Sequence, residues 1–220
     1  MLGSMTAVHP SRPLRLHRHR LSGHSHRVEL MLALLGLPYE LVDVDLVGRA
    51  HKAPDFLAMN AFGQIPVLQD GDVTLADSNA ILVYLAGTYG DPSWLPQTPL
   101  GAAAVQRWLS VAAGQLAHGP AAARVANVFG ASPPAADLVA RSHALLAVVQ
   151  RHLESKPAEG PFLAADHPTI ADVALYTYVA HAPEGGVSLA DYPTVRAWLA
   201  RVEALPGFVP MVTSPVGLNA

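Results

Sequence analysis

The chain of 220 residues contains no cysteine. A protein without cysteine has no disulfide, no thiolate zinc site and no cysteine nucleophile of its own. Charged residues are also few, at 14% of the chain, and 14 basic against 17 acidic residues leave a net charge of −3. This weak acidic balance argues against nucleic acid and against an anionic membrane surface as partners.

Long apolar runs are missing as well. No stretch reaches membrane-spanning length, and residues 1–13 contain no apolar core of a signal peptide. We therefore expect a cytoplasmic protein that does not enter a membrane. Residues 1–13 are expected to be disordered, with MLGSM a tag and Met5 the natural start. Hydrophobic residues, by contrast, are abundant: they make up 51% of the chain, which is enough for the core of one or two domains.

The first half of the chain predicts a small α/β domain over residues 14–90. Alternation over 14–18 predicts a strand, apolar residues at helical spacing predict a helix that ends at Gly36, and 39–46 predict a second strand. A short helical turn opens at Pro54. Residues 60–82, NAFGQIPVLQDGDVTLADSNAIL, then predict strand, tight turn, strand and a helix that continues to about residue 89.

Two features of residues 60–82 predict a binding site for a peptide-like ligand. A cis Ile65-Pro66 bond at the front of the strand would turn the backbone N–H and C=O of Ile65 outward. Asp77 and Ser78 would lie beside free N–H groups at the start of the following helix.

The second half predicts helices only. A proline-rich linker over 91–98 leads into an all-helical domain over 99–220. Its expected helices cover 100–118, interrupted at Gly119-Pro120 and continued near 121–128, then 135–153, 173–180 and 194–205. Thr169 and Asp172 have the spacing of a capping box, which is a structural role.

An α/β domain that carries F-G-Q-I-P and D-S-N-A-I, joined to a helical domain with T-I-A-D, resembles the cytosolic glutathione transferases. The resemblance covers about residues 14–210. It implies a thioredoxin-like N-terminal domain that binds glutathione and a helical C-terminal domain that shapes a site for a hydrophobic electrophile. It also implies a homodimer. We expect no metal.

The site residues follow from the same resemblance. The stretch L-S-G-H-S-H-R-V from Leu21 is similar to the S-x-x-x-x-R-V motif of the serine-type phi and theta groups, whose serine donates a hydrogen bond to the glutathione sulfur. Ser22 takes that place, and Ser25 is the alternative donor. The residues expected to bind glutathione are His51, Lys52, Gln64, Ile65, Pro66, Asp77 and Ser78. The family more often has Glu than the shorter Asp before that serine. The residues expected at the electrophile site are Ser25, Ala112, Gln115 and Arg124.

These residue types suit thiol chemistry. Only a thiolate is a good nucleophile near neutral pH. A charge-assisted hydrogen bond from a hydroxyl contributes roughly 1.5–3 kcal/mol, which lowers a thiol pKa by about one to two units. The hypothesis is therefore a transferase that conjugates glutathione to hydrophobic electrophiles.

Other interpretations stay open at this point. Ser22 and Ser25 could serve only as helix caps, and His51 and Lys52 could be solvated loop charges. The pairs His17-x-His19 and His24-x-His26 could bind metal, although arginines between them and the lack of nearby acidic ligands argue against it. The alternative functions are a glutathione-dependent isomerase, dehalogenase or peroxidase, and a non-catalytic binding or assembly module.

Overall fold

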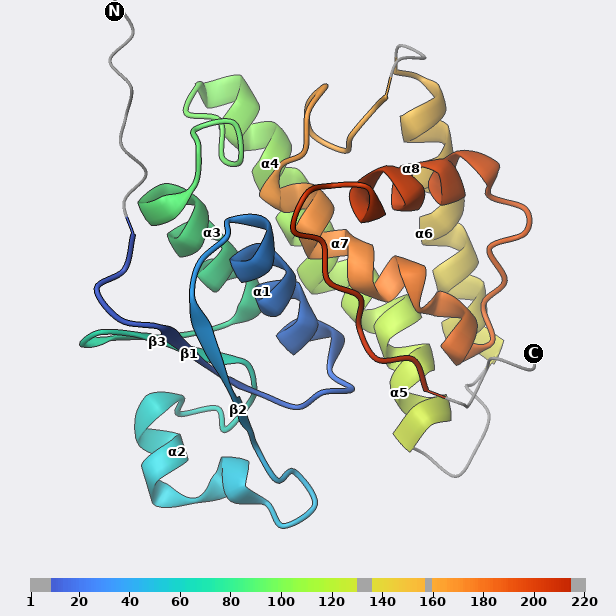
Figure 1. Cartoon of the computed structure of the whole chain (residues 1–220). Helices are drawn as coiled ribbons and strands as arrows, with labels where there is room; N and C mark the ends of the chain where they lie inside the picture. Colours follow the sequence, from blue (N-terminus) through green and yellow to red (C-terminus); the bar gives the residue numbers. More distant parts are fainter. Residues whose placement is uncertain (1–8, 130–135, 157–159, 215–220) are drawn as a thin grey trace, which may run out of the picture.

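The computed structural model describes residues 9–129, 136–156 and 160–214 (Figure 1). Most of the expected N-terminal tag segment, residues 1–8, lies outside these ranges. The elements, in chain order, are β1 (Leu14–Arg18), α1 (Gly23–Leu34), β2 (Tyr39–Asp43), η1 (Ala50–Lys52), α2 (Pro54–Met59), β3 (Val67–Asp70), β4 (Val73–Ala76), α3 (Ser78–Tyr89), α4 (Pro99–Val111), η2 (Ala112–Ala121), α5 (Ala122–Phe129), α6 (Ala136–Glu154), α7 (Ile170–Ala180), η3 (Ala182–Gly185) and α8 (Pro193–Glu203).

Four strands form one mixed sheet in the order β2-β1-β3-β4. β1 pairs in parallel with β2, Leu16 opposite Leu41, and antiparallel with β3, Leu16 opposite Leu68. A parallel pair needs a crossover, which α1 supplies. β3 and β4 form an antiparallel hairpin whose turn contains Gly71 at φ 59°. This arrangement is the expected thioredoxin-like domain.

The two faces of the sheet pack against different helices. Leu14, Leu16 and Leu68 belong to a core that includes residues of α1 and α3. Val67 instead packs with Val44 and with Phe56 of α2. The alternation of side chains along a strand explains this division, and Figure 1 shows α2 apart from α1 and α3.

The helical half is built around α7. Every residue from Ile170 to Val179 is buried, as expected of a helix that is mostly apolar on all sides. The core around α7 continues without a break into the core above the sheet. The predicted capping box is confirmed: Thr169 Oγ1 accepts a hydrogen bond from Ala171 N, and Asp172 Oδ2 accepts one from Thr169 N at 2.9 Å.

One predicted break is wrong. The chain stays helical through Gly119-Pro120, because α4, η2 and α5 follow one another directly from Pro99 to Phe129. A proline inside an α-helix clashes with the carbonyl of the preceding turn. η2 is a π-helix with Pro120 inside it, and its wider turns give the ring room.

The remaining elements lie close to their predicted positions. The second strand ends at Asp43, earlier than predicted, and β3 begins at Val67, directly after Pro66. The two-part fold class is thus confirmed, and the domain limits of 14–90 and 99–220 stay a prediction. In the described ranges no helix is both long enough and apolar enough to cross a bilayer.

His26 joins α1 to the helical half and makes stability depend on pH. It is 3% exposed, and its Nε2 donates to Val209 O while its Nδ1 accepts from Thr177 Oγ1, both at 2.9 Å. Burial lowers the pKa of His26 to about 4, despite the opposing effect of the Val209 carbonyl.

We expect the free energy of unfolding to fall as the pH falls from 6.5 toward 4. In that window an unfolded histidine with a pKa near 6.5 binds a proton that folded His26 does not. The contribution of neutral His26 to the free energy of unfolding is therefore complete above pH 6.5 and is lost as the pH falls toward 4. At about 1.36 kcal/mol per pH unit, the loss between pH 6 and 4.5 is roughly 2 kcal/mol. Urea unfolding at a series of pH values measures it. His26→Gln should make this slope less steep, although His24, whose pKa is also lowered to about 4, still contributes. His118→Gln, on the exposed side of η2, should leave the slope unchanged; equal slopes in all three proteins would contradict the assignment.

Candidate functional site

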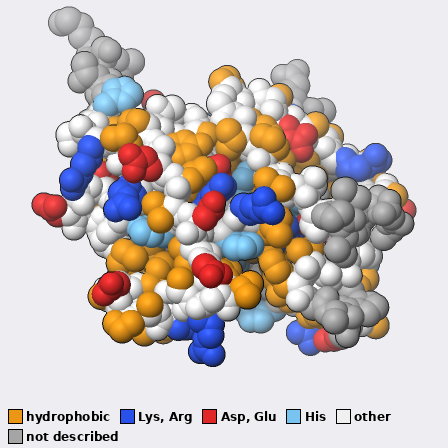
Figure 2. All heavy atoms as spheres, turned by 60° about the horizontal axis from the view of Figure 1, so that its bottom comes forward, with side chains coloured by type: hydrophobic (Ala, Val, Ile, Leu, Met, Phe, Trp, Pro, Cys, Tyr) orange, Lys and Arg blue, Asp and Glu red, His pale blue; other side chains and the backbone are white. Residues whose placement is uncertain are grey.

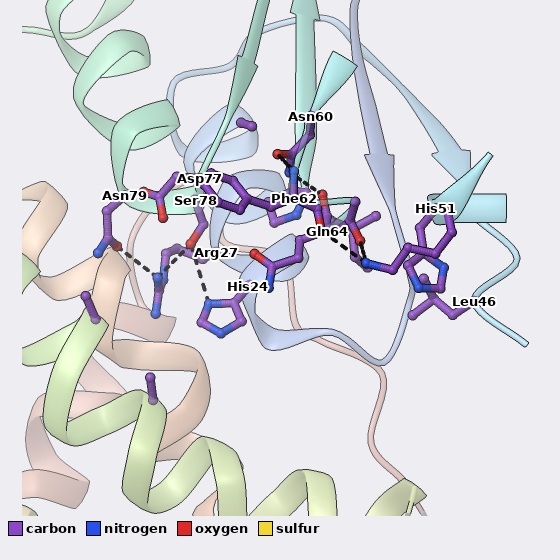
Figure 3. Close-up of a pocket in the computed structure, with 17 residues that line it drawn as sticks. His24, Arg27, Leu46, His51, Asn60, Phe62, Gln64, Asp77, Ser78 and Asn79 are labelled. Atoms are coloured by element: carbon purple, nitrogen blue, oxygen red, sulfur yellow. Dashed lines mark hydrogen bonds between the residues drawn. The ribbon is translucent and has the colours of Figure 1, made fainter. Parts of the chain in front are cut away.

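A cavity of about 830 Å³ opens between the loops of the sheet domain and η2 (Figure 3). All seven residues predicted to contact glutathione lie in its wall. The lining residues are His24, Arg27, Leu46, His51, Lys52, Asn60, Phe62, Gly63, Gln64, Ile65, Pro66, Ala76, Asp77, Ser78, Asn79, Ala113 and Ala117. The Ile65-Pro66 bond in this wall is cis, as predicted.

The amino end of α3 forms one end of the cavity. Asp77 is its N-cap, and the Asp77 carboxylate accepts a hydrogen bond from Ala80 N at 2.9 Å. Asp77 also adopts φ 71°, a strained conformation for a residue with a side chain, of the kind that gathers at binding sites. Since α3 begins at Ser78, the N–H groups of Ser78 and Asn79 have no acceptor within the helix. This end of the cavity suits a carboxylate.

Arg27 adds a buried positive charge at the same end. Its side chain is 1% exposed, and Nη1 donates to Ser78 Oγ and to Asn79 Oδ1, both at 2.8 Å. Its Nε and Nη2 have no hydrogen-bond partner among the described residues, and no carboxylate there lies within ion-pair distance. Burial lowers the pKa of Arg27 to about 10, which still leaves it charged at neutral pH. An anionic ligand would satisfy this cation.

His24 lies beside Ser78 (Figure 3). Its Nδ1 is 3.5 Å from Ser78 Oγ, and its ring meets Tyr178 edge-on with centroids 4.9 Å apart. Burial and the neighbouring charge of Arg27 lower the pKa of His24 to about 4, so the ring is neutral at neutral pH. Because Ser78 Oγ accepts from Arg27, its hydrogen is free to be donated to His24 Nδ1.

The opposite end of the cavity is held by Lys52 and Asn60. Lys52 Nζ donates to the carbonyls of Phe62 and Gly63, at 3.0 and 2.9 Å. Asn60 Nδ2 donates to Gln64 O, and Asn60 Oδ1 accepts from Phe62 N. These bonds fix the loop that precedes Pro66. An ammonium group has three donors, so Lys52 keeps one for a ligand.

Ser22 is the N-cap of α1, which begins at Gly23. Ser22 Oγ accepts a hydrogen bond from Ser25 N at 3.3 Å. Ser22 itself is half-buried and is not among the residues that line the cavity, whereas His24 and Arg27 on the same helix do line it. The structure therefore shows Ser22 as the cap of α1, two residues before His24 of the cavity wall.

The four residues predicted for the electrophile site are not brought to this cavity. Ser25, Arg124 and Ala112 are buried, and none of the three is among the residues that line the cavity. Ser25 Oγ accepts from His19 N, and Arg124 pairs with Glu184. Gln115 faces a second cavity between η2 and α6, beside Trp108. The residues of η2 that do face the first cavity are Ala113 and Ala117.

The clustered histidines have separate partners. His17 Nε2 bonds to Gln69 Oε1 at 2.9 Å, and His19 Nδ1 accepts from Leu21 N at 3.3 Å. His24 faces the cavity, and His26 bridges to the helical half. Within the described ranges, no group of three or more histidine, aspartate or glutamate side chains is placed to hold a metal ion.

Sequence reasoning gave Arg27 and His24 no part in binding glutathione, and it considered His24 only as one of a possible metal-binding pair. Arg27 is the arginine of the S-x-x-x-x-R-V motif, so the motif itself was a signal for a site residue. His24 had a signal only in its position between Ser22 and Arg27 on the first turn of the helix.

Comparison with known proteins agrees with this fold. Residues 12–87 match the family model described as glutathione S-transferase, N-terminal domain, and residues 138–210 match the glutathione S-transferase C-terminal domain. Glutathione S-transferase 3 of Zea mays is 39% identical over 207 residues, 89% of this chain and 91% of the relative. Human glutathione S-transferase theta-2 is 32% identical over 201 residues, 88% of this chain and 82% of the relative.

Solved structures give the same result. A glutathione S-transferase from Pseudomonas fluorescens superposes with a TM-score of 0.85 at 35% identity, covering 92% of this chain and all of that one. A glutathione transferase homologue from Drosophila mojavensis, solved with bound glutathione, has a TM-score of 0.79 at 27% identity and covers 88% of this chain and 89% of that one.

A thioredoxin-like domain fused to a helical domain, with a peptide-sized cavity between them, defines a glutathione-dependent class of protein. The chain belongs to the glutathione S-transferase family. It is a transferase, and glutathione is the co-substrate of its family.

Proposed function

We propose that this protein conjugates the thiolate of glutathione to hydrophobic electrophiles, and that the Ser22 hydroxyl stabilises the thiolate. The observation that carries the proposal is the cavity wall, in which a carboxylate site at α3 and a cation at Lys52 stand on either side of the cis Ile65-Pro66 bond. Glutathione is a tripeptide with a carboxylate at each end, so it matches this order of groups.

Each end of the tripeptide has a binding partner in the proposal. The γ-glutamyl carboxylate lies at Ser78 and the free N–H groups of α3, where Arg27 provides the opposite charge. The cysteinyl backbone pairs with the N–H and C=O of Ile65, and the glycyl carboxylate meets Lys52, with His51 and Gln64 beside it. That the Drosophila mojavensis homologue was solved with bound glutathione supports glutathione as the ligand.

Capping α1 and activating the thiol are compatible roles for Ser22. The cap uses a lone pair of Oγ, which accepts from Ser25 N. The hydroxyl hydrogen is still free, and a sulfur anion is a suitable acceptor. The thiolate then attacks the electrophilic carbon, a carbon–sulfur bond forms, and either a leaving group departs or a polarised double bond takes up the electrons.

The electrophile lies against the apolar part of η2. Ala113 and Ala117 replace Ala112, Gln115 and Arg124 as its proposed contacts, because they are the η2 residues that face the cavity. Small side chains leave room for a bulky apolar group but do not identify it.

The test is a titration of glutathione into the protein while thiolate absorbance is followed in the ultraviolet. We expect a thiolate signal near neutral pH and, on adding an activated aryl halide, formation of the thioether. Binding and a thiolate signal without conjugation of any electrophile would favour a glutathione-dependent isomerase or peroxidase. No binding of glutathione would overturn the proposal in favour of an assembly module.

We also propose a cytoplasmic homodimer. Phe62 is 80% exposed at the rim of the cavity, and an aromatic side chain so placed is a natural contact for a second copy. Sedimentation should give twice the chain mass for the natural protein. Phe62→Ala should shift the equilibrium toward monomer, whereas Phe129→Ala, which removes another exposed phenylalanine, should not. A monomer at all concentrations would refute the dimer.

On the face turned forward in Figure 2, basic and acidic side chains are interspersed among hydrophobic ones. This pattern supports small molecules and protein, rather than nucleic acid, as partners.

A further inference from the structure

The loop that carries Ser22 is contacted by Arg124, a buried arginine of the helical domain. Arg124, on α5, donates from Nη1 to the carbonyl oxygen of Leu21 at 2.7 Å. This carbonyl belongs to the peptide group that links Leu21 to Ser22, so its direction fixes where the Ser22 backbone lies. Arg124 is 1% exposed, so its side chain is shielded from bulk water.

Arg124 is itself held in one orientation. Its Nε donates to Glu184 Oε2 at 2.6 Å, while Glu184 Oε1 accepts from His181 Nδ1 at 2.8 Å and from Ser214 N at 3.0 Å. Burial alone would raise the pKa of Glu184, but the hydrogen bonds from His181 and Ser214 and the charge of Arg124 outweigh it and lower the pKa. Glu184 is thus a carboxylate, and it holds one edge of the guanidinium while the other edge reaches Leu21.

Other contacts of the loop come mostly from its own neighbourhood. Ser22 N donates to His19 O at 2.9 Å, and Leu21 N donates to His19 Nδ1. These bonds shape the loop but do not tie it to the helical half of the molecule. The contact from Arg124 does, because α5 follows directly on η2, the helix that lines the cavity.

We propose that Arg124 is a positioning residue, which aims the Ser22 hydroxyl at the glutathione sulfur by holding the Leu21 carbonyl. The inference rests on the proposed role of Ser22. A positioning role explains why the charged side chain of Arg124 is buried in α5, away from the cavity that Arg124 was predicted to line.

The experiment compares Arg124→Met, Ser22→Ala and the double variant. The readouts are kcat, KM for glutathione, and the pH at which bound glutathione becomes a thiolate. Arg124→Met should lower kcat about tenfold and raise the midpoint pH by about one unit, because a small displacement of the donor weakens its hydrogen bond to the thiolate. KM for glutathione should change less than twofold. The double variant should be no worse than Ser22→Ala alone, since Arg124 acts only through Ser22.

The matched control is Arg151→Met, at an exposed site in the last turn of α6, which should leave all three readouts unchanged. If Arg124→Met does not fold, Arg124→Lys keeps a cation opposite Glu184 but lacks the planar fork, and it should show the same rise in midpoint pH.

Additive losses in the double variant, or an unchanged midpoint in a folded Arg124 variant, would overturn the positioning role while leaving the function intact. A normal midpoint in Ser22→Ala would instead overturn the role of Ser22 itself, and with it the route by which Arg124 acts.

Discussion

Ser22→Ala is expected to lower kcat for conjugation by roughly 10²-fold while leaving the affinity for glutathione nearly unchanged. Losing one preorganised donor to a developing or resident anion typically costs a factor of about 10²–10³. Affinity should survive because the binding contacts proposed for glutathione lie at Ser78, Ile65 and Lys52, on other segments of the chain. Thiolate absorbance at neutral pH and steady-state kinetics measure the two effects separately.

Two controls separate this effect from a loss of stability. Ser22→Ala also removes the α1 cap, which costs about 1 kcal/mol. Thr98→Ala removes the corresponding cap of α4, where Thr98 Oγ1 accepts from Gly101 N at 3.2 Å, and should leave turnover unchanged. Ser78→Ala should show the reverse pattern of Ser22→Ala, with weaker binding of glutathione. Unchanged turnover in both serine variants would contradict the assignment of the site.

The sequence predicted the glutathione end of the site because local structure determines it. A turn, a proline before a strand and a polar pair before a helix each act within a few residues. This is why Ile65, Pro66, Asp77 and Ser78 could be predicted from local pattern, whereas Gln64, which also lines the cavity, was predicted only from the family resemblance. Their individual contacts with glutathione stay a prediction. The capping box at Thr169 and Asp172 was predictable for the same reason.

The cavity residues that come from η2 could not be predicted, because they depend on the rotation of one alanine-rich helix. Residues 112–121 offer small apolar side chains on several faces, so the pattern does not say which face meets the sheet domain. The π-helical turns of η2 change that rotation further, since each takes more than the usual 3.6 residues. Ala113 and Ala117 therefore line the cavity, and Ala112 does not.

The two buried arginines show a second limit. Arg27 and Arg124 are each 1% exposed, although arginine is normally a surface residue. Their partners, Ser78 for Arg27 and Glu184 for Arg124, are 51 and 60 residues away in the chain. Long-range polar pairs of this kind leave no periodic signal in a single sequence.

Asp172→Ala is expected to destabilise the fold by about 4 kcal/mol, since breaking a buried polar network that leaves several donors unpaired is among the costliest single changes. Asp172 is fully buried. Its Oδ1 accepts from Leu163 N at 2.8 Å and from Trp198 Nε1 at 3.0 Å, and its Oδ2 accepts from the N–H and hydroxyl of Thr169. The carboxylate thereby joins the start of α7 to Trp198 of α8 and to Leu163, in the segment that precedes α7. Alanine at position 172 would leave the donors of Leu163, Trp198 and Thr169 without this acceptor.

Urea unfolding measures the loss of stability. Asp172→Asn should lose less stability than Asp172→Ala, because an amide keeps the shape but offers one acceptor oxygen in place of two. Asp137→Ala, on the exposed side of α6 with a partner at Arg141, should change stability little.

Since α7 packs against α1 and α3 beneath the glutathione site, the Asp172 variants should lose activity at a lower temperature than the natural protein. Where they remain folded, kcat should be close to normal, because Asp172 does not line the cavity. A folded Asp172→Asn protein with low kcat would instead give this residue a part in the chemistry.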